Sequence, residues 1–252
     1  MRTTMKTALR IACVLCLSVA CAARAADDAK KEGPKLADLP KTADGAYILF
    51  NGKDLTGWDG DPRFWSVEDG AITGKTVADP KLTSNTFLIF RGGNVKDFEL
   101  RLKWRLDNGN SGVQFRSKQH PDNKDNKWVV GGYQADIADN PYLGILYEEK
   151  GPRAIAAEVG QKVTLLPDKK KNVEKIGDPK EIKAGVNHKD WNEYVITAKG
   201  NHIVQKLNGK TTVEVIDEDE KNRAMEGILA LQIHVGPPMK VQFKDITLKV
   251  LE

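Results

Sequence analysis

The sequence predicts an all-β domain, a β-sandwich or jelly roll that carries one short helix. Apolar and polar residues alternate with a period of two along most of the chain after residue 45, which is typical of half-buried antiparallel strands. Gly-rich turns separate these segments at short intervals, as they do in sandwiches and jelly rolls. The length after residue 45 suits one large domain of this class.

The N-terminus reads as a secretory signal peptide. The basic residues Arg2, Lys6 and Arg10 precede an apolar run at 11–22, and Ala23-Arg24-Ala25 follows as an A-x-A cleavage site. The apolar run has about 12 residues, fewer than the roughly 20 that a membrane-spanning helix needs. We therefore expect cleavage after Ala25, no membrane span, and a periplasmic or secreted protein.

Lipidation at Cys21 is the alternative for this segment, but Ser18 stands where a lipoprotein signal normally has Leu. All three cysteines, at positions 13, 16 and 21, lie within residues 1–25. The same residues include four basic side chains and no acidic one, which accounts for the whole formal net charge of +4. The mature chain is thus predicted to lack thiol chemistry, disulfides and the excess positive charge that binding of nucleic acid requires.

Residues 26–45 are rich in Lys, Asp, Ala and Pro without an apolar period, and we expect a flexible leader there. The sandwich domain is expected to span residues 46–252. Its first hairpin is predicted at Trp65–Val67 and Ala71–Thr73, on either side of Asp69-Gly70. Asx-Gly pairs favour tight hairpins because they tolerate positive φ angles.

Later elements follow the same two patterns. Residues 98–106 alternate strictly between apolar and charged side chains and predict a half-buried strand. Strands at 202–207 and 211–216 flank Asn208-Gly209, a second hairpin signal. The one short helix is expected from 217 to about 224, because Asp217 and Glu220 have the spacing of a capping box.

Three predicted strands place a pair of polar side chains on one face, and each pair begins with Gln. In every case the apolar residues between them point to the other face. The pairs are Gln114 with Arg116, Gln134 with Asp136, and Gln232 with His234. If the strands share a sheet, a cation, a carboxylate and an imidazole converge, a set that can orient and ionise a substrate. An ordinary solvated sheet face is the alternative interpretation.

Seven segments, in order along the chain, resemble one known family. They are Leu49–Trp58, Trp65–Gly70, Asn110–Arg116, Tyr133–Asp136, Gly144–Tyr147, Trp191–Tyr194 and Val241–Ile246. The sequence between about Tyr47 and Leu251 is similar to the bacterial 3-keto-disaccharide hydrolase family. The resemblance implies a concanavalin A-like jelly-roll sandwich, and action on glycosides whose C3 hydroxyl has been oxidised to a ketone.

That substrate class implies an unusual demand on the catalytic groups. Ordinary glycosidases need two carboxyl groups that flank the scissile bond, and no clear pair stands out in the sequence. A C3 ketone acidifies the C2 proton, so the C1 substituent can leave by β-elimination before water adds. His234 is our candidate for the base, and Arg116 or a divalent metal for stabilising the enolate. Asp136 is expected to orient His234 or, with it, to bind that metal.

Substrate contacts are expected from polar and aromatic residues around the same face. They are Gln114, Gln134, Gln232, Asn110, Tyr147, Glu148 and Trp128. No cofactor is assigned with certainty, but oxygen ligands at this face would suit Ca²⁺ or Mg²⁺. The expected partner is a small-molecule or oligosaccharide substrate.

The chain departs from the family pattern at one position. Many relatives have an acidic residue directly before the Tyr-Gln pair, where this chain has Gly132. Glu148, on the following strand, is our candidate to replace that acid. Without a replacement, the same fold would serve as a non-catalytic, lectin-like carbohydrate-binding module.

Overall fold

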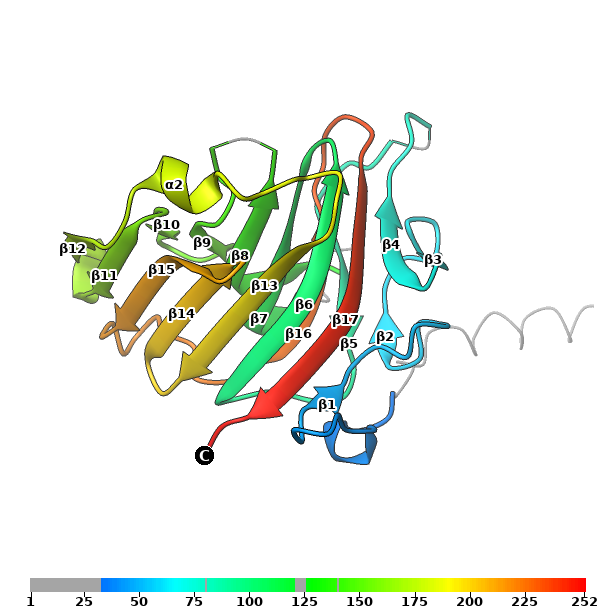
Figure 1. Ribbon diagram of the computed structural model, residues 1–252, viewed down its shortest axis with the longest axis horizontal. Helices are drawn as coiled ribbons and strands as arrows, with labels where there is room; N and C mark the ends of the chain where they lie inside the picture. Colours follow the sequence, from blue (N-terminus) through cyan, green and yellow to red (C-terminus); the bar gives the residue numbers. More distant parts are fainter. Residues whose placement is uncertain (1–32, 80, 121–125, 140) are drawn as a thin grey trace, which may run out of the picture. The chain divides into compact units, whose positions relative to one another are not determined.

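The computed structural model describes residues 33–79, 81–120, 126–139 and 141–252. The predicted signal peptide and the leader up to residue 32 lie outside this part of the chain. The described residues form two antiparallel-rich sheets packed face to face, which confirms the all-β sandwich (Figure 1). No helix among them is long and apolar enough to cross a membrane.

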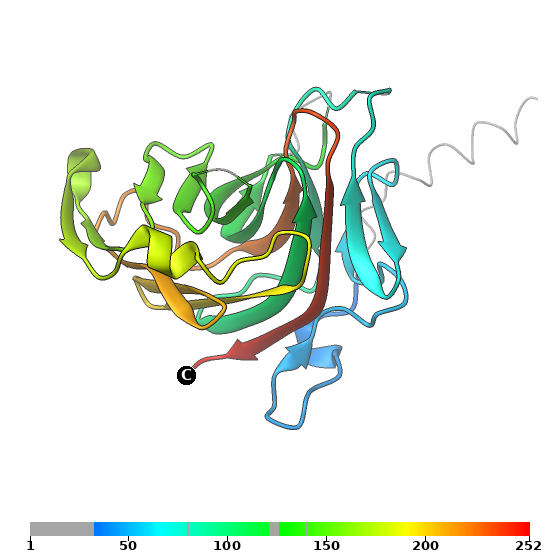
Figure 2. The same ribbon diagram turned by 45° about the horizontal axis from the view of Figure 1, so that its top comes forward.

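The larger sheet has ten strands. In order across the sheet, nine of them are β12 (Lys171–Lys175), β11 (Gln161–Leu165), β15 (Lys210–Asp217), β14 (His202–Leu207), β13 (Asn192–Lys199), β6 (Phe98–Asp107), β17 (Lys240–Val250), β4 (Ala71–Lys75) and β3 (Trp65–Glu68). The tenth, β1 (Tyr47–Ile48), pairs with β17 off this path. Figure 2 shows how the long strands β6 and β17 curve side by side through this sheet.

The smaller sheet has seven strands and forms the other layer. Its order is β10 (Ala154–Ala157), β9 (Leu146–Glu149), β8 (Val130–Ala138), β7 (Asn110–Gln119), β16 (Ile228–Ile233), β5 (Thr86–Phe90) and β2 (Trp58–Asp59). The neighbouring strands β7 and β8 contain Gln114 with Arg116 and Gln134 with Asp136. Their neighbour β16 contains Gln232 and ends directly before His234. The three strands therefore lie in one sheet, which is the condition under which the sequence analysis expects their polar pairs to converge.

The core lies between the sheets and follows the period of two. Phe98, Leu100, Leu102, Trp104 and Leu106 are buried while the residues between them face outward. Across the core, Tyr133 of β8 stacks on Phe115 of β7 at 5.6 Å between ring centroids. The polar partners of these core residues, such as Gln134 beside Tyr133, must consequently lie on the face turned away from the larger sheet.

Both predicted hairpins are present, since β3 pairs with β4 and β14 with β15. Asn208 and Gly209 both have positive φ, 47° and 79°, as a tight turn between twisted strands requires. The helix predicted at 217–224 is wrong. Asp217 instead ends β15 as a buried ion-pair partner, and turns follow it.

The α-helix that the structure describes is α2 (Pro179–Lys183), whose first turn is capped by the Asp178 side chain. Two 3₁₀ turns, η1 (Leu36–Asp38) and η2 (Pro167–Lys169), complete the elements of the described residues. Part of the predicted leader is ordered: the Leu36 amide donates to the Gly92 carbonyl, and Leu36 and Leu39 pack against the core.

Candidate active site

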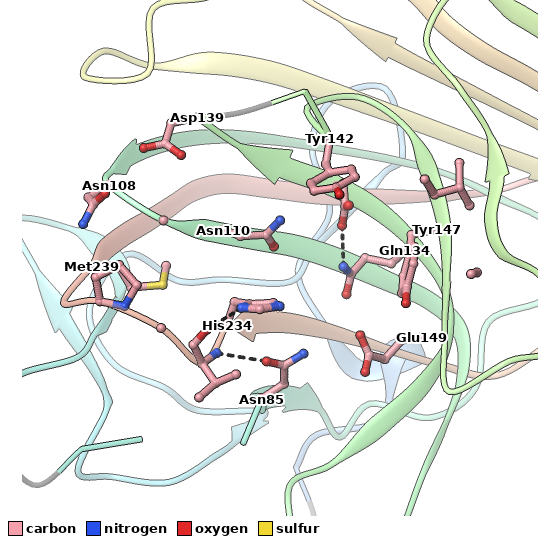
Figure 3. A pocket seen from close by; sticks show the side chains of 17 residues that line it. Asn85, Asn108, Asn110, Gln134, Asp139, Tyr142, Tyr147, Glu149, His234 and Met239 are labelled. Carbon is pink, nitrogen blue, oxygen red and sulfur yellow. Dashed lines mark hydrogen bonds between the residues drawn. The ribbon is translucent and has the colours of Figure 1, made fainter. Parts of the chain in front are cut away.

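One cavity of about 650 Å³ opens over the outer face of the smaller sheet (Figure 3). Strands β7, β8 and β9 supply its floor, and the loop after β16 supplies one wall. Its lining side chains include Gln134, Asp136, Tyr147, Glu149 and His234. A volume of this size is ordinary for a small-molecule site.

A chain of buried amides leads to the carboxyl group of Asp136. The Ser117 hydroxyl donates to Gln114 Oε1 at 2.7 Å, and Gln114 Nε2 donates to Gln134 Oε1 at 2.8 Å. Gln134 Nε2 then donates to Asp136 Oδ1 in a short hydrogen bond. Each amide is thereby oriented by its neighbour, and the chain presents a donor to the carboxyl group at its end.

A third glutamine connects to the second acid of the cavity. Gln232 Oε1 accepts a long bond from Gln134 at 3.4 Å, and Gln232 Nε2 donates to Glu149 Oε2 at the same distance. Gln114 and Gln232 are fully buried behind the cavity. Gln114 and Gln232 therefore help to position the acids. Of the three glutamines expected to contact substrate, Gln134 is the one that lines the cavity.

Asp136 is placed where a charged carboxylate is costly. Burial raises the pKa of Asp136 to about 7, with the hydrogen bond from Gln134 opposing the shift and the charge of Glu149 adding to it. The protonated form of this carboxyl group is therefore populated near neutral pH. A protonated Asp136 can donate a hydrogen bond to a substrate oxygen.

Glu149 provides the second carboxyl group. It stands directly opposite Gly132 in the pairing of β8 with β9 and lines the cavity. Burial raises the pKa of Glu149, while the positive charge of Lys150 and hydrogen bonds with Asn85 and Gln232 oppose the shift. Glu149 is therefore biased toward holding its proton.

His234 lies just beyond the end of β16, with its ring in the cavity. Its Nδ1 is 2.6 Å from the carbonyl oxygen of Val235. Because a carbonyl only accepts, Nδ1 carries a proton, so in the neutral form of the ring the lone pair lies on Nε2. The structure thus gives His234 the tautomer that a base requires.

Close packing against β7 explains why position 132 is a glycine. Its φ is 142°, and a Cβ there would lie 2.5 Å from the Ser117 hydroxyl and 2.8 Å from the Ser117 Cα. No side chain fits without moving the backbone of β7. The acid of this corner comes from Glu149, across the strand pair, and our choice of Glu148 was wrong by one residue.

Glu148 instead belongs to a buried ion-pair cluster. Arg153 Nη2 donates to Glu148 Oε1 at 2.8 Å, and Arg153 Nη1 donates to Asp217 Oδ2 at 2.7 Å. Tyr133 donates its hydroxyl proton to the same carboxylate of Asp217. Since side chains alternate along β9, Glu148 points to the core side and Glu149 to the cavity.

Arg116 is also absent from the cavity, against our expectation. The pairing of β7 with β8 shifts register between Phe115 and Lys118, and Arg116 adopts a φ of 46°. This bulge turns its side chain away, so the guanidinium binds Asp97 and the carbonyl oxygens of Lys96 and Gly200. Arg116 is a structural residue.

Trp128 likewise lies elsewhere, with its indole Nε1 3.3 Å from Asp59 Oδ1 and the Lys127 ammonium over its ring. Asn110 and Tyr147 do line the cavity, as predicted. The sequence reasoning missed Glu149, Asn85, Asp139 and Tyr142. Only Glu149 carried a signal, since it alternates with Glu148; the others stand in turns and loops, where no period predicts a face.

The predicted Ca²⁺ or Mg²⁺ ligands Asp136 and His234 both line the cavity, and a metal ion there stays a prediction. In the described part of the chain, no group of three or more His, Cys, Asp or Glu is close enough to share an ion. Asp136 already accepts from Gln134, and His234 uses Nδ1 on a carbonyl. Ca²⁺ and Mg²⁺ prefer six or more oxygen ligands.

The raised pKa of Asp136 predicts a pH-dependent stability difference. Between the pKa of an unfolded Asp, about 4, and the folded value of about 7, the native state binds the extra proton, so wild-type stability falls as pH rises. Asp136→Asn removes this cost. We expect the variant to gain stability relative to wild type from pH 4 to pH 8, by on the order of 2–4 kcal/mol. Urea unfolding at several pH values measures it; a constant difference would contradict the prediction.

Comparison with known proteins agrees with the fold and narrows the function. The family described as the 3-keto-alpha-glucoside-1,2-lyase-like domain matches residues 45–249. A 3-keto-disaccharide hydrolase of Bacteroides thetaiotaomicron is 36% identical over 89 residues, which are 32% of this chain and 30% of that protein. The matched part thus spans about a third of the curated relative's length.

Solved structures share the architecture at low identity. A candidate glycosyl hydrolase from Parabacteroides distasonis has a TM-score of 0.54 and 22% identity over 83% of this chain and 95% of its own. A Bacillus subtilis protein with a galectin-like fold has a TM-score of 0.51 and 9% identity over 77% and 89% of the two chains. These similarities support the lectin-like sandwich alone.

Proposed function

The chain belongs to the 3-keto-alpha-glucoside-1,2-lyase-like domain family, and from this membership we propose that it cleaves 3-keto-glycosides by β-elimination followed by hydration. One observation carries the proposal: His234, whose Nδ1 is held by the Val235 carbonyl, shares a cavity with two carboxyl groups whose pKa values are raised. A base beside two proton donors is the set that this chemistry needs.

In the first step, His234 Nε2 removes the C2 proton of the keto sugar. The electron pair of the C2–H bond moves toward the C3 ketone and forms an enolate. Asp136, when protonated, donates a hydrogen bond to the developing oxygen charge, as neutral carboxylic acids do in other enolising sites. Asp136 thus takes the part that we had expected Arg116 to play.

In the second step, the enolate re-forms the ketone and expels the C1 substituent. The C1–O bond breaks with its electrons on the leaving oxygen, which takes a proton from Glu149. A C1–C2 double bond conjugated with the ketone remains. Burial raises the pKa of Glu149, which favours the protonated form that this step requires.

Hydration completes the cycle. Ionised Glu149 takes a proton from water as its oxygen bonds to C1, and the His234 imidazolium returns a proton to C2. The product is the free 3-keto sugar, and both side chains recover their starting protonation states. The sequence of proton transfers needs no group outside the cavity.

We further propose that the protein acts outside the cytoplasm. The support is the signal-peptide pattern at residues 1–25, which lie outside the described part of the chain. A periplasmic or secreted location would expose the cavity to environmental glycosides. Detection of the mature N-terminus at Ala26 in a periplasmic or culture fraction tests this proposal.

A direct assay tests the activity. Purified protein is incubated with 4-nitrophenyl 3-keto-glucoside, and release of nitrophenol is followed by absorbance. Release supports the enzyme; binding without release supports the lectin-like alternative. A parallel reaction with chelator tests the predicted Ca²⁺ or Mg²⁺ requirement, and unoxidised nitrophenyl glucoside serves as the control for the role of the ketone.

Two adjacent glutamates provide a matched pair of variants. Glu149→Gln removes the proposed acid, and we expect kcat to fall about 10²- to 10³-fold with little loss of stability. Glu148→Gln weakens a buried ion pair instead, and we expect it to lower the melting temperature while each folded molecule keeps its activity. Nitrophenol release and thermal unfolding, measured on both variants, should show opposite patterns. Equal activity losses would contradict the assignment.

A further inference from the structure

The cavity extends well beyond the three proposed reacting groups. Its second half is built by the turn between β6 and β7, by the segment after β8, and by the loop after β16 (Figure 3). The side chains of this half are Asn108, Asn110, Asp139, Tyr142 and Met239. It thus combines amides, a carboxylate and an aromatic ring.

This second half has the features of a binding surface. The total volume of about 650 Å³ lies within the range for ligands larger than a single sugar ring. Asn110 Oδ1 is a buried oxygen without a hydrogen-bond partner in the described structure, and it belongs to the lining. A buried acceptor of this kind is satisfied by a hydroxyl group of a bound ligand.

The charge of the lining is one-sided. Asp136, Asp139 and Glu149 contribute carboxyl groups, and no Lys or Arg is among the described residues that line the cavity. Lys150 acts electrostatically on Glu149 but is not part of the lining. Because Asp136 and Glu149 act as proton donors in the proposed reaction, a phosphate, sulfate or carboxylate on a ligand would meet the carboxylate of Asp139, with no Lys or Arg in the described lining to compensate.

We propose that the site selects 3-keto-disaccharides whose leaving sugar is uncharged or cationic, and rejects those whose leaving sugar is anionic. Asp139, which is exposed at the rim of the second half, is the specificity-determining residue. This inference rests on the proposed function, because it assigns the second half of the cavity to the leaving sugar. It adds a substrate class that the family description does not specify.

The test compares two substrates that differ in one charge. One is a 3-keto-disaccharide of two glucose units, and the other carries a 6-phosphate on the leaving glucose. At low salt we expect kcat/KM to favour the neutral compound by about 30-fold or more, and the ratio to shrink severalfold in 0.5 M NaCl. Equal kcat/KM values at low salt would overturn the inference.

Matched variants separate charge from shape. Asp139→Asn should narrow the ratio by about 3- to 10-fold, because it removes one repulsive charge and keeps the side-chain volume. Asp107→Asn removes one negative charge at the end of β6, outside the cavity lining, and should leave the ratio of the kcat/KM values unchanged. If the ratio of the two kcat/KM values changed neither with salt nor with Asp139→Asn, the anionic compound would be rejected for steric reasons. That result would contradict the role of Asp139.

Binding distinguishes failure of this inference from failure of the proposed function. Calorimetry of both compounds with the His234→Ala variant measures their affinities without turnover. Tighter binding of the neutral compound supports the inference even if wild-type protein cleaves neither, an outcome that would contradict the activity alone. Equal affinities overturn the inference even if both compounds are cleaved.

Discussion

Replacement of His234 by alanine should reduce kcat/KM for a 3-keto-glucoside by about 10³- to 10⁴-fold. General bases contribute roughly 10²- to 10⁴-fold to enzymatic proton transfers, and C2 deprotonation is the first bond-breaking step of the proposed reaction. The residual rate would come from Asp136 and Glu149. Nitrophenol release under subsaturating substrate measures the loss.

The fold should tolerate this replacement. His234 follows the end of β16, and within the described residues its ring has a single hydrogen bond, to the carbonyl of the next residue, so we expect little change in melting temperature. His202→Ala is the matched control, since His202 pairs with Glu214 on an exposed hairpin of the other sheet. Wild-type activity in His234→Ala, or equal losses in both variants, would contradict the assignment of the base.

Replacement of Arg153 by methionine should destabilise the protein by about 3–5 kcal/mol. Arg153 is the cation between the Glu148 and Asp217 carboxylates, and the three side chains are 1–6% exposed. Removal of the cation leaves two buried carboxylates without a charge partner, which is the costly way to break a buried ion pair. Urea unfolding at pH 7 measures the change in the free energy of unfolding.

A surface ion pair gives the control for this effect. Arg101 pairs with Glu99 at 2.8 Å, but the Arg101 side chain is 51% exposed. Arg101→Met should therefore change stability by less than about 1 kcal/mol. If Arg153→Met were equally mild, the buried cluster would not be a major contribution to the fold.

Much of the architecture followed from local pattern. The alternation along 98–106 predicted a strand with one buried face, and Asx-Gly pairs located both hairpins. The helix at 217–224 failed because a capping pattern is a local signal, whereas Asp217 is held by long-range contacts to Tyr133 and Arg153. Such contacts leave no trace in a short window of sequence.

The candidate site was predictable where the strands are regular. Alternation of side chains predicted that Gln134, Asp136, Gln232 and His234 share one face. In the structure Gln134, Asp136 and His234 line the cavity, and Gln232 is hydrogen-bonded to Gln134. It failed at Arg116, because a bulge inserts an extra residue and reverses the faces that follow. The turn and loop residues of the cavity depend on how distant segments meet, which only the folded chain determines.

Because Glu148 and Glu149 are adjacent, the register of β9 against β8 decides which of the two side chains faces the cavity. Two backbone hydrogen bonds just before this strand, from Gly144 to the Asp136 carbonyl and from Asp136 to the Ile145 carbonyl, fix how β9 is aligned with β8. A deletion of one residue in that turn would exchange the two glutamates, placing the partner of Arg153 in the cavity and the proposed acid in the core. Loss of folding and loss of chemistry would then arise together, although every side chain of the site was still encoded.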